Sequence, residues 1–207
     1  MTLPGAGCRM IIYLHGLNSS GDSRKAGLLR LALAPRPVLS PTYPAHRPRE
    51  AVETLERFLR ELNGARGDRK RWVLIGSSMG GFYGRYLAQR CAMDHLFLIN
   101  PALHPWELFA DFLGHTFTTA SGEPYRVDRA LLAATRDYAV EELAPEPPTT
   151  VFLDEGDEVI DFRVAQEVYR DRGRLYVFPG GDHAFGHLEQ AVAVIRDTLD
   201  DLRDVTR

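Results

Sequence analysis

Cysteine is scarce in this chain. Its 207 residues include only two cysteines, Cys8 and Cys91. Two thiols are too few for a disulfide framework or for a metal site built from thiolates. The first apolar run, residues 10–14, is much shorter than a signal-peptide core and is followed by no small-residue cleavage site. We therefore expect a cytoplasmic protein.

Long apolar runs and basic blocks are also missing. The longest apolar runs fall far short of the length that spans a bilayer. Arginine supplies 23 of the 25 basic residues, yet 28 acidic residues outnumber them and the net charge is −3. Neither a membrane nor a nucleic acid is an expected partner. The length and the 44% hydrophobic content predict one globular domain over residues 1–207.

The most informative segment is centred on Ser78. Residues 72–75 (WVLI) are typical of a strand buried on both faces, and residues 82–90 have helical spacing. Between them, GSSMG (76–80) fits the G-x-S-x-G motif. A strand that turns this sharply into a helix needs small flanking residues and strains the residue at the corner. The pattern predicts that Ser78 stands exposed before a helix N-terminus, although a glycine-rich turn without chemistry also fits it.

Strand and helix patterns alternate along the chain. Strands are predicted at 10–14, 38–40, 72–75, 95–100, 149–153 and 175–178, and helices at 23–33, 50–62, 82–90, 162–170 and 187–202. His95, at the start of a strand, is expected at the surface. The alternation predicts an α/β fold with a mainly parallel six-stranded sheet and helices on both faces. Right-handed crossovers then bring the carboxyl ends of all strands to one edge.

Residues 102–148 break this alternation. The segment is rich in aromatic residues, and its pattern indicates short helices separated by Gly114, Gly122 and Pro124. It is too long for a plain connection between two strands, which favours a small helical cap inserted over one end of the sheet. The aromatic side chains can fill the core of the cap, line a substrate pocket, or do both.

A serine nucleophile needs a base, and the base needs an acid that orients it. In serine hydrolases built on such a sheet, the acid and then the histidine follow the serine along the chain, on loops at strand ends. Five carboxylates lie within residues 154–161. Asp157 ranks first as the acid because it follows a turn glycine and precedes Val159 and Ile160, which can anchor the loop against the next helix. Asp161 ranks second and Asp154 third. The cluster also fits a solvated loop, and no metal is expected because its spacing matches no Ca²⁺ loop.

The base is predicted in the loop after the sixth strand, GGDHAFGH (180–187). His183 lies where the base is needed, whereas His187 is placed to cap the last helix. Three further histidines, His46, His104 and His115, fail the positional test.

Two backbone N–H groups are predicted to bind the oxyanion of the tetrahedral intermediate. One belongs to Met79, directly after the nucleophile, and the other to Leu17, in the loop that follows the first strand at His15-Gly16. The ring of His15 is expected to hold this loop by hydrogen bonds.

Five segments between Ile12 and Phe185 carry a resemblance to a known family. They are IYLHGLNSS, IGSSMGGFYGRYLA, LINPA, GDEVIDFR and GGDHAF. In this order they resemble the small YqiA-type esterases of the α/β-hydrolase superfamily. The resemblance implies a Ser-Asp-His triad of Ser78, Asp157 and His183, with activity on short acyl esters. The chain departs from the family pattern at residues 21–22, at Met79 and at residues 186–187. None of these departures removes a triad residue, but Met79 and His187 can alter pocket shape and substrate choice.

The sequence therefore predicts a cofactor-independent serine esterase whose partner is a small-molecule ester. A thioesterase or an amidase uses the same triad and remains an alternative. A binding protein that kept the fold without activity is a second alternative, since a fold does not confer a function by itself. The complete set of triad residues argues against it.

Overall fold

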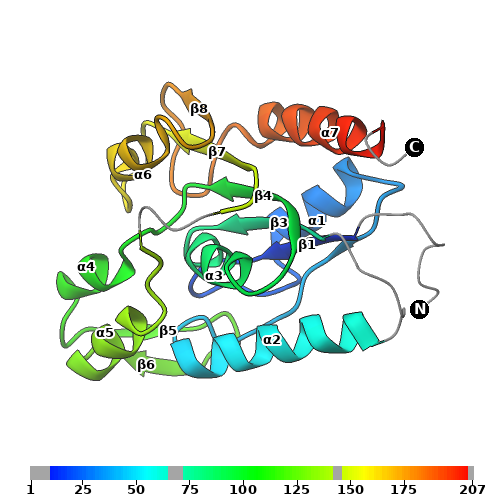
Figure 1. The fold of residues 1–207 in the computed structure, drawn as a ribbon. Helices are drawn as coiled ribbons and strands as arrows, with labels where there is room; N and C mark the ends of the chain where they lie inside the picture. The colour runs from blue at the N-terminus through cyan, green and yellow to red at the C-terminus, as the bar shows by residue number, and fades with distance from the viewer. Residues whose placement is uncertain (1–9, 65–71, 142–145, 205–207) are drawn as a thin grey trace.

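A six-stranded parallel sheet forms the centre of the molecule. The computed structural model describes residues 10–64, 72–141 and 146–204. The strands are β1 (Met10–Leu14), β2 (Val38–Leu39), β3 (Trp72–Ser77), β4 (Met93–Ile99), β7 (Thr149–Asp154) and β8 (Arg174–Phe178). Their order across the sheet is β2-β1-β3-β4-β7-β8, and every pairing is parallel (Figure 1). The predicted sheet is confirmed.

Helices cover both faces of this sheet. Helices α2 (Pro48–Gly64), α3 (Met79–Ala88) and α6 (Phe162–Tyr169) pack on one face, and α1 (Arg24–Ala32) and α7 (Leu188–Asp204) on the other (Figure 1). Side chains alternate along each strand: Trp72 and Leu74 join the first core, whereas Val73 and Ile75 join the second. Because β3 is buried on both sides, its sequence is a continuous apolar run.

The direction of strand addition reverses between β1 and β3. After β1 the chain adds β2 on one side, returns to place β3 on the other, and then continues outward through β4, β7 and β8. In parallel sheets, ligands bind at the carboxyl ends of strands beside such a reversal. The loops that follow β1 and β3 carry Gly16 and Ser78.

The cap is helical only in part. It contains the helices α4 (Pro105–Ala110) and α5 (Arg129–Arg136), but also an antiparallel hairpin of β5 (Thr116–Thr118) and β6 (Pro124–Arg126). The prediction of a cap without strands is therefore wrong. Gly122, at a φ of +84°, lets the turn close with its N–H 3.0 Å from the Thr119 carbonyl oxygen. Three-residue strands are too short for their periodicity to be recognised.

His95 lies in the interior, so the expectation of a surface position is wrong. Strand β4 begins two residues earlier, at Met93, and the His95 side chain is buried with Nε2 2.9 Å from Thr150 Oγ1. Burial lowers the pKa of His95 to about 4, which keeps the ring neutral near pH 7.

The structure also bears on the cysteines and on possible membrane-spanning helices. Cys8 lies outside the described residues, and Cys91 is a half-buried free thiol. Within the described ranges, no helix has the length and apolar character needed to cross a membrane.

Candidate active site

Ser78 occupies a strained corner between β3 and α3. Its φ of +55° and ψ of −122° lie outside the regions that non-glycine residues favour. A Cβ atom on Gly80 would lie 2.0 Å from the carbonyl oxygen of Leu14, and one on Gly76 would lie 2.5 Å from that of Gly80. The two glycines therefore permit the close approach of helix and strand. Ser78 is partly exposed although both of its neighbours are buried.

His183 lies between Ser78 and Asp157. Its Nε2 atom is 3.1 Å from Ser78 Oγ, and its Nδ1 atom is 2.9 Å and 3.0 Å from Asp157 Oδ2 and Oδ1. An N–H at Nδ1 that donates to the carboxylate leaves Nε2 free to accept the serine proton. The Asp157 side chain is 1% exposed and that of His183 25% exposed. The three predicted residues therefore meet in one chain of hydrogen bonds at the carboxyl ends of β3, β7 and β8.

The loop after β7 holds Asp157 in a fixed orientation. Asp157 Oδ1 accepts hydrogen bonds from the backbone N–H groups of Val159 and Ile160, each at 2.9 Å. Asp161, the second-ranked acid, instead caps α6 by accepting from the N–H of Arg163 at 3.0 Å. Asp154 pairs with another histidine. Among the described residues, no group of three or more His, Cys, Asp or Glu side chains is arranged to hold a metal ion.

The two proposed oxyanion donors lie beside Ser78. Met79 is the first residue of α3, and Leu17 follows a turn so close that a Cβ atom on Gly16 would be 3.1 Å from Ser78 Cβ. Within the described part of the chain, neither N–H donates to a turn, loop or side-chain acceptor. Both residues line the same cavity as Ser78. This placement is compatible with the predicted oxyanion site.

His15 has the structural role predicted for it. The ring is fully buried, with Nδ1 2.8 Å from the carbonyl oxygen of Gly16, and Nε2 accepts from the N–H of Tyr43 at 3.4 Å. Burial lowers the pKa of His15. A neutral ring with both nitrogens in use holds the loop and is not free to move protons.

A cavity of about 1290 Å³ opens over Ser78 and His183. The cap residues that line it are largely apolar, and helices α1 and α7 contribute further lining residues. The cap contributes Pro105, Leu108, Phe109, Phe112, Phe117, Tyr125 and Val127. Other cap aromatics pack elsewhere, since Trp106 contacts Phe82 and Tyr138 contacts Tyr86. Within the cap, Phe117 contacts both Phe112 and Tyr125, so these cavity-lining aromatics also pack against one another.

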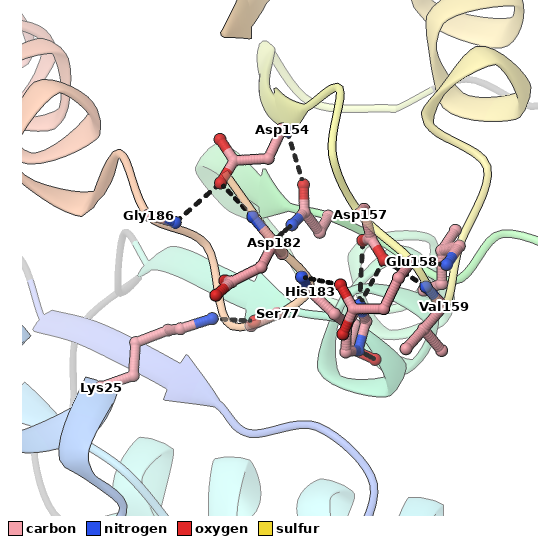
Figure 2. A network of polar contacts seen from close by, with 12 residues as sticks. Lys25, Ser77, Asp154, Asp157, Glu158, Val159, Asp182, His183 and Gly186 are labelled. Carbon is pink, nitrogen blue, oxygen red and sulfur yellow. Dashed lines mark hydrogen bonds and ion pairs between the residues drawn. The ribbon is translucent and has the colours of Figure 1, made fainter. Parts of the chain in front are cut away.

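Lys25 is a charged residue of this site that sequence reasoning missed. It lines the cavity from α1, and its Nζ atom is 2.7 Å from Oγ of Ser77, the neighbour of Ser78 (Figure 2). Burial lowers the pKa of Lys25 from its ordinary 10.5 to about 8, against the opposing effect of Asp154, Asp182 and Asp157. No local pattern distinguishes this lysine from Arg24 and Arg30, the other basic residues on the same helix.

The buried Lys25 makes stability depend on pH. Between about pH 8 and 10.5 the unfolded chain keeps a proton that the folded protein has lost, so the free energy of unfolding rises with pH. Between pH 7.5 and 9.5 we expect the free energy of unfolding of the wild type to rise by about 1–2 kcal/mol more than that of Lys25→Met. Guanidinium unfolding of both proteins at both pH values measures this difference, in which all other titrating groups cancel. A pH-independent difference would contradict the burial of the charge.

Asn100 is a second residue that the sequence analysis missed. It follows β4 with a φ of +40°, and its side chain is buried. Its Oδ1 accepts from the N–H of Asp154 at 2.9 Å, and its Nδ2 donates to the carbonyl oxygen of Asp182 at 3.1 Å. It therefore links β4, β7 and the histidine loop. An asparagine directly before Pro101 was the available signal, because asparagine tolerates positive φ better than most residues.

Three features together define an α/β-hydrolase fold. They are the order of the strands in the sheet, the strained Ser78 between β3 and α3, and the reversal of strand addition between β1 and β3. The chain belongs to the family described as "Uncharacterised protein family (UPF0227)", whose model matches residues 10–199. This match confirms the resemblance to the YqiA-type family.

Solved structures share this architecture. The chain is similar to Est1E from Butyrivibrio proteoclasticus with ferulic acid bound, at a TM-score of 0.77, 14% identity and coverage of 97% of this chain and 90% of that one. It is also similar to the esterase domain of a Rhodothermus marinus protein, at a TM-score of 0.71 and 17% identity, with coverage of 98% of this chain and 90% of that one. Mouse alpha/beta hydrolase domain-containing protein 10 matches at a TM-score of 0.68 and 16% identity, with coverage of 96% of this chain and 90% of that one. At these identities the likeness establishes the fold.

Proposed function

We propose that this protein is a serine hydrolase that cleaves carboxylic esters through an acyl-enzyme on Ser78. The observation that carries the proposal is the continuous hydrogen-bond chain from Ser78 Oγ through the His183 ring to the buried Asp157 carboxylate. Ser78, at its strained backbone corner, and His183 both line the cavity. The esterases among the structural neighbours support this choice of reaction.

Each group has a role in the proposed mechanism. Ser78 Oγ attacks the ester carbonyl while His183 Nε2 takes its proton, and Asp157 stabilises the resulting imidazolium. The N–H groups of Met79 and Leu17 bind the negative oxygen of the tetrahedral intermediate. His183 returns the proton to the departing alcohol, which leaves the acyl group on Ser78. A water molecule, deprotonated by His183, then releases the acid and restores the serine, so no cofactor is required.

The acyl group is proposed to lie against the cap. The cap residues that line the cavity are aromatic or aliphatic, whereas the lining residues from α1 and α7 include Lys25 and Arg196. An apolar acyl chain loses water-exposed area when it binds the cap residues. The preference for short acyl chains rests on the family resemblance, and thioesters or amides would react at the same serine.

Labelling with a fluorophosphonate tests the proposed nucleophile. We expect one adduct by intact mass, mapped to the peptide that contains Ser78, and a much slower reaction in His183→Ala. Hydrolysis of 4-nitrophenyl esters from acetate to decanoate, with a matched thioester and anilide, then measures which bond and chain length are preferred. A folded wild type that gives no adduct and no saturable turnover would support the binding protein instead.

A further inference from the structure

One buried carboxylate holds three residues of the loop that carries His183. Asp154 Oδ2 accepts from the N–H of Gly186 at 2.7 Å and from that of Asp182 at 3.3 Å. Asp154 Oδ1 lies 2.7 Å from Nδ1 of His187. Figure 2 shows the Asp154 carboxylate against the backbone of the loop, at Gly186 and Asp182. The third-ranked acid and the second-ranked histidine of the sequence analysis therefore form an acid–imidazole pair of their own.

The shape of the loop depends on this carboxylate. Asp154 is fully buried at the end of β7, where an ionised group is tolerated only when donors surround it. A Cβ atom on Gly181 would lie 2.0 Å from Asp154 Oδ2, so the backbone packs directly on the carboxylate. Gly180, Gly181 and Phe185 all have φ values between +72° and +75°. Glycine adopts such φ values without strain, but Phe185 does not, and its conformation needs surrounding contacts to persist.

The peptide groups that lead to His183 are fixed from two sides. Asp154 accepts from the N–H of Asp182, and Asn100 donates to the carbonyl oxygen of the same residue at 3.1 Å. The N–H of His183 itself donates to Glu158 Oε2 at 3.0 Å. The backbone that leads to the His183 Cα atom is thus set before its side chain reaches Ser78.

The ring of His187 is fixed by stacking. It lies nearly parallel to Phe178, at 9° with ring centroids 4.8 Å apart. The stacked ring places its Nδ1 atom 2.7 Å from Asp154 Oδ1 and thereby belongs to the loop's support.

We infer that Asp154 is a positioning residue for His183, and that the N–H of His187 Nδ1 completes the donors of its carboxylate. The inference rests on the proposed function, because the place of His183 matters only if His183 transfers protons. A displacement of about 1 Å in a reacting group can cost about 100-fold in rate.

The first test removes the carboxylate. In Asp154→Ala we expect kcat for a 4-nitrophenyl ester to fall about 10- to 100-fold, with a smaller effect on KM, because Ser78 and the cap residues that line the cavity stay in place while the loop that carries His183 changes. In Asp154→Asn the fall in kcat should be smaller, since the amide oxygen of the asparagine still accepts hydrogen bonds from the backbone N–H groups of the loop. Tyr169→Phe is the matched control: it removes the hydrogen bond from the Tyr169 hydroxyl to Glu146 Oε2, near the start of β7, and should leave kcat unchanged.

A second pair of variants tests His187. His187→Asn keeps a side-chain N–H near the position of Nδ1 and should retain most of kcat. His187→Phe keeps an aromatic ring against Phe178 but leaves Asp154 without this donor, and should reduce kcat about threefold to tenfold. Equal losses in both variants would overturn the role given to the His187 N–H.

The decisive comparison repeats Asp154→Ala in a His183→Ala background. If Asp154 acts through His183, adding Asp154→Ala to the His183→Ala protein should lower the residual activity by less than about twofold. A full loss in that background, or a folded Asp154→Ala protein with wild-type kcat, would overturn the inference. Wild-type turnover that does not depend on His183 would refute the proposed function instead. Imidazole NMR signals provide a readout without substrate: Asp154→Asn should shift those of His183, and unchanged signals would contradict its positioning.

Discussion

Replacing Ser78 with alanine should lower kcat for a 4-nitrophenyl ester by about 10⁴-fold or more while leaving the fold intact. The substitution deletes only the hydroxyl that lies 3.1 Å from His183 Nε2. Alanine keeps the Cβ atom, so the strain at a φ of +55° is the same in both proteins. Ester hydrolysis above the uncatalysed rate and the circular dichroism spectrum together measure the two expectations.

Ser77 provides a matched control within the same motif. Its hydroxyl is buried and accepts from Lys25 Nζ at 2.7 Å, on the face of the sheet that α1 and α7 cover. Ser77→Ala should cost about 1 kcal/mol of stability, because Lys25 loses an acceptor, and leave kcat within about threefold. Similar losses in the two variants, or near wild-type activity in Ser78→Ala, would contradict an acyl-enzyme on Ser78.

The elements whose sequence pattern reflects burial were predictable. Residues 72–75 and 10–14 are apolar because they are covered on both faces, and that pattern needs no knowledge of the neighbours. The same holds for the turn at Ser78, where the glycines are required by close backbone contacts around the turn. The places of Asp157 and His183 followed because parallel strands bring their carboxyl ends together.

The features that were missed depend on contacts between distant segments. His95 can be buried because Thr150, 55 residues away, provides its hydrogen-bond partner, and burial in turn keeps the ring neutral. Asp154 and His187 are 33 residues apart, and each has a reasonable local role in the sequence as a loop acid and a helix cap. The β5–β6 hairpin was missed for another reason, since three-residue strands carry almost no periodic signal. Local patterns thus indicated the fold and the candidate catalytic residues, but not the residues that hold them in place.

Asp157→Asn should reduce kcat about 10³- to 10⁴-fold, whereas Asp161→Asn should have little effect. The amide that replaces the Asp157 carboxylate would still face the ring, but its NH₂ group cannot accept from Nδ1 and its oxygen carries no charge. If the amide nitrogen faces Nδ1, His183 must carry its proton on Nε2, where it can no longer accept from Ser78. Asp161 bonds the N–H of Arg163 at the start of α6, and an asparagine side chain caps a helix equally well.

The pH dependence of kcat separates the role of Asp157 from a general loss of stability. Without the carboxylate, the imidazolium that forms as Ser78 attacks has no buried counter-charge. Activity that remains should therefore increase with hydroxide concentration above the pH at which the wild-type rate is constant, since hydroxide replaces the base. Asp161→Asn should keep the wild-type profile. A severe loss in Asp161→Asn beside a mild one in Asp157→Asn would assign the acid to Asp161 and would mean that the 2.9 Å contact between Asp157 and His183 does not support catalysis.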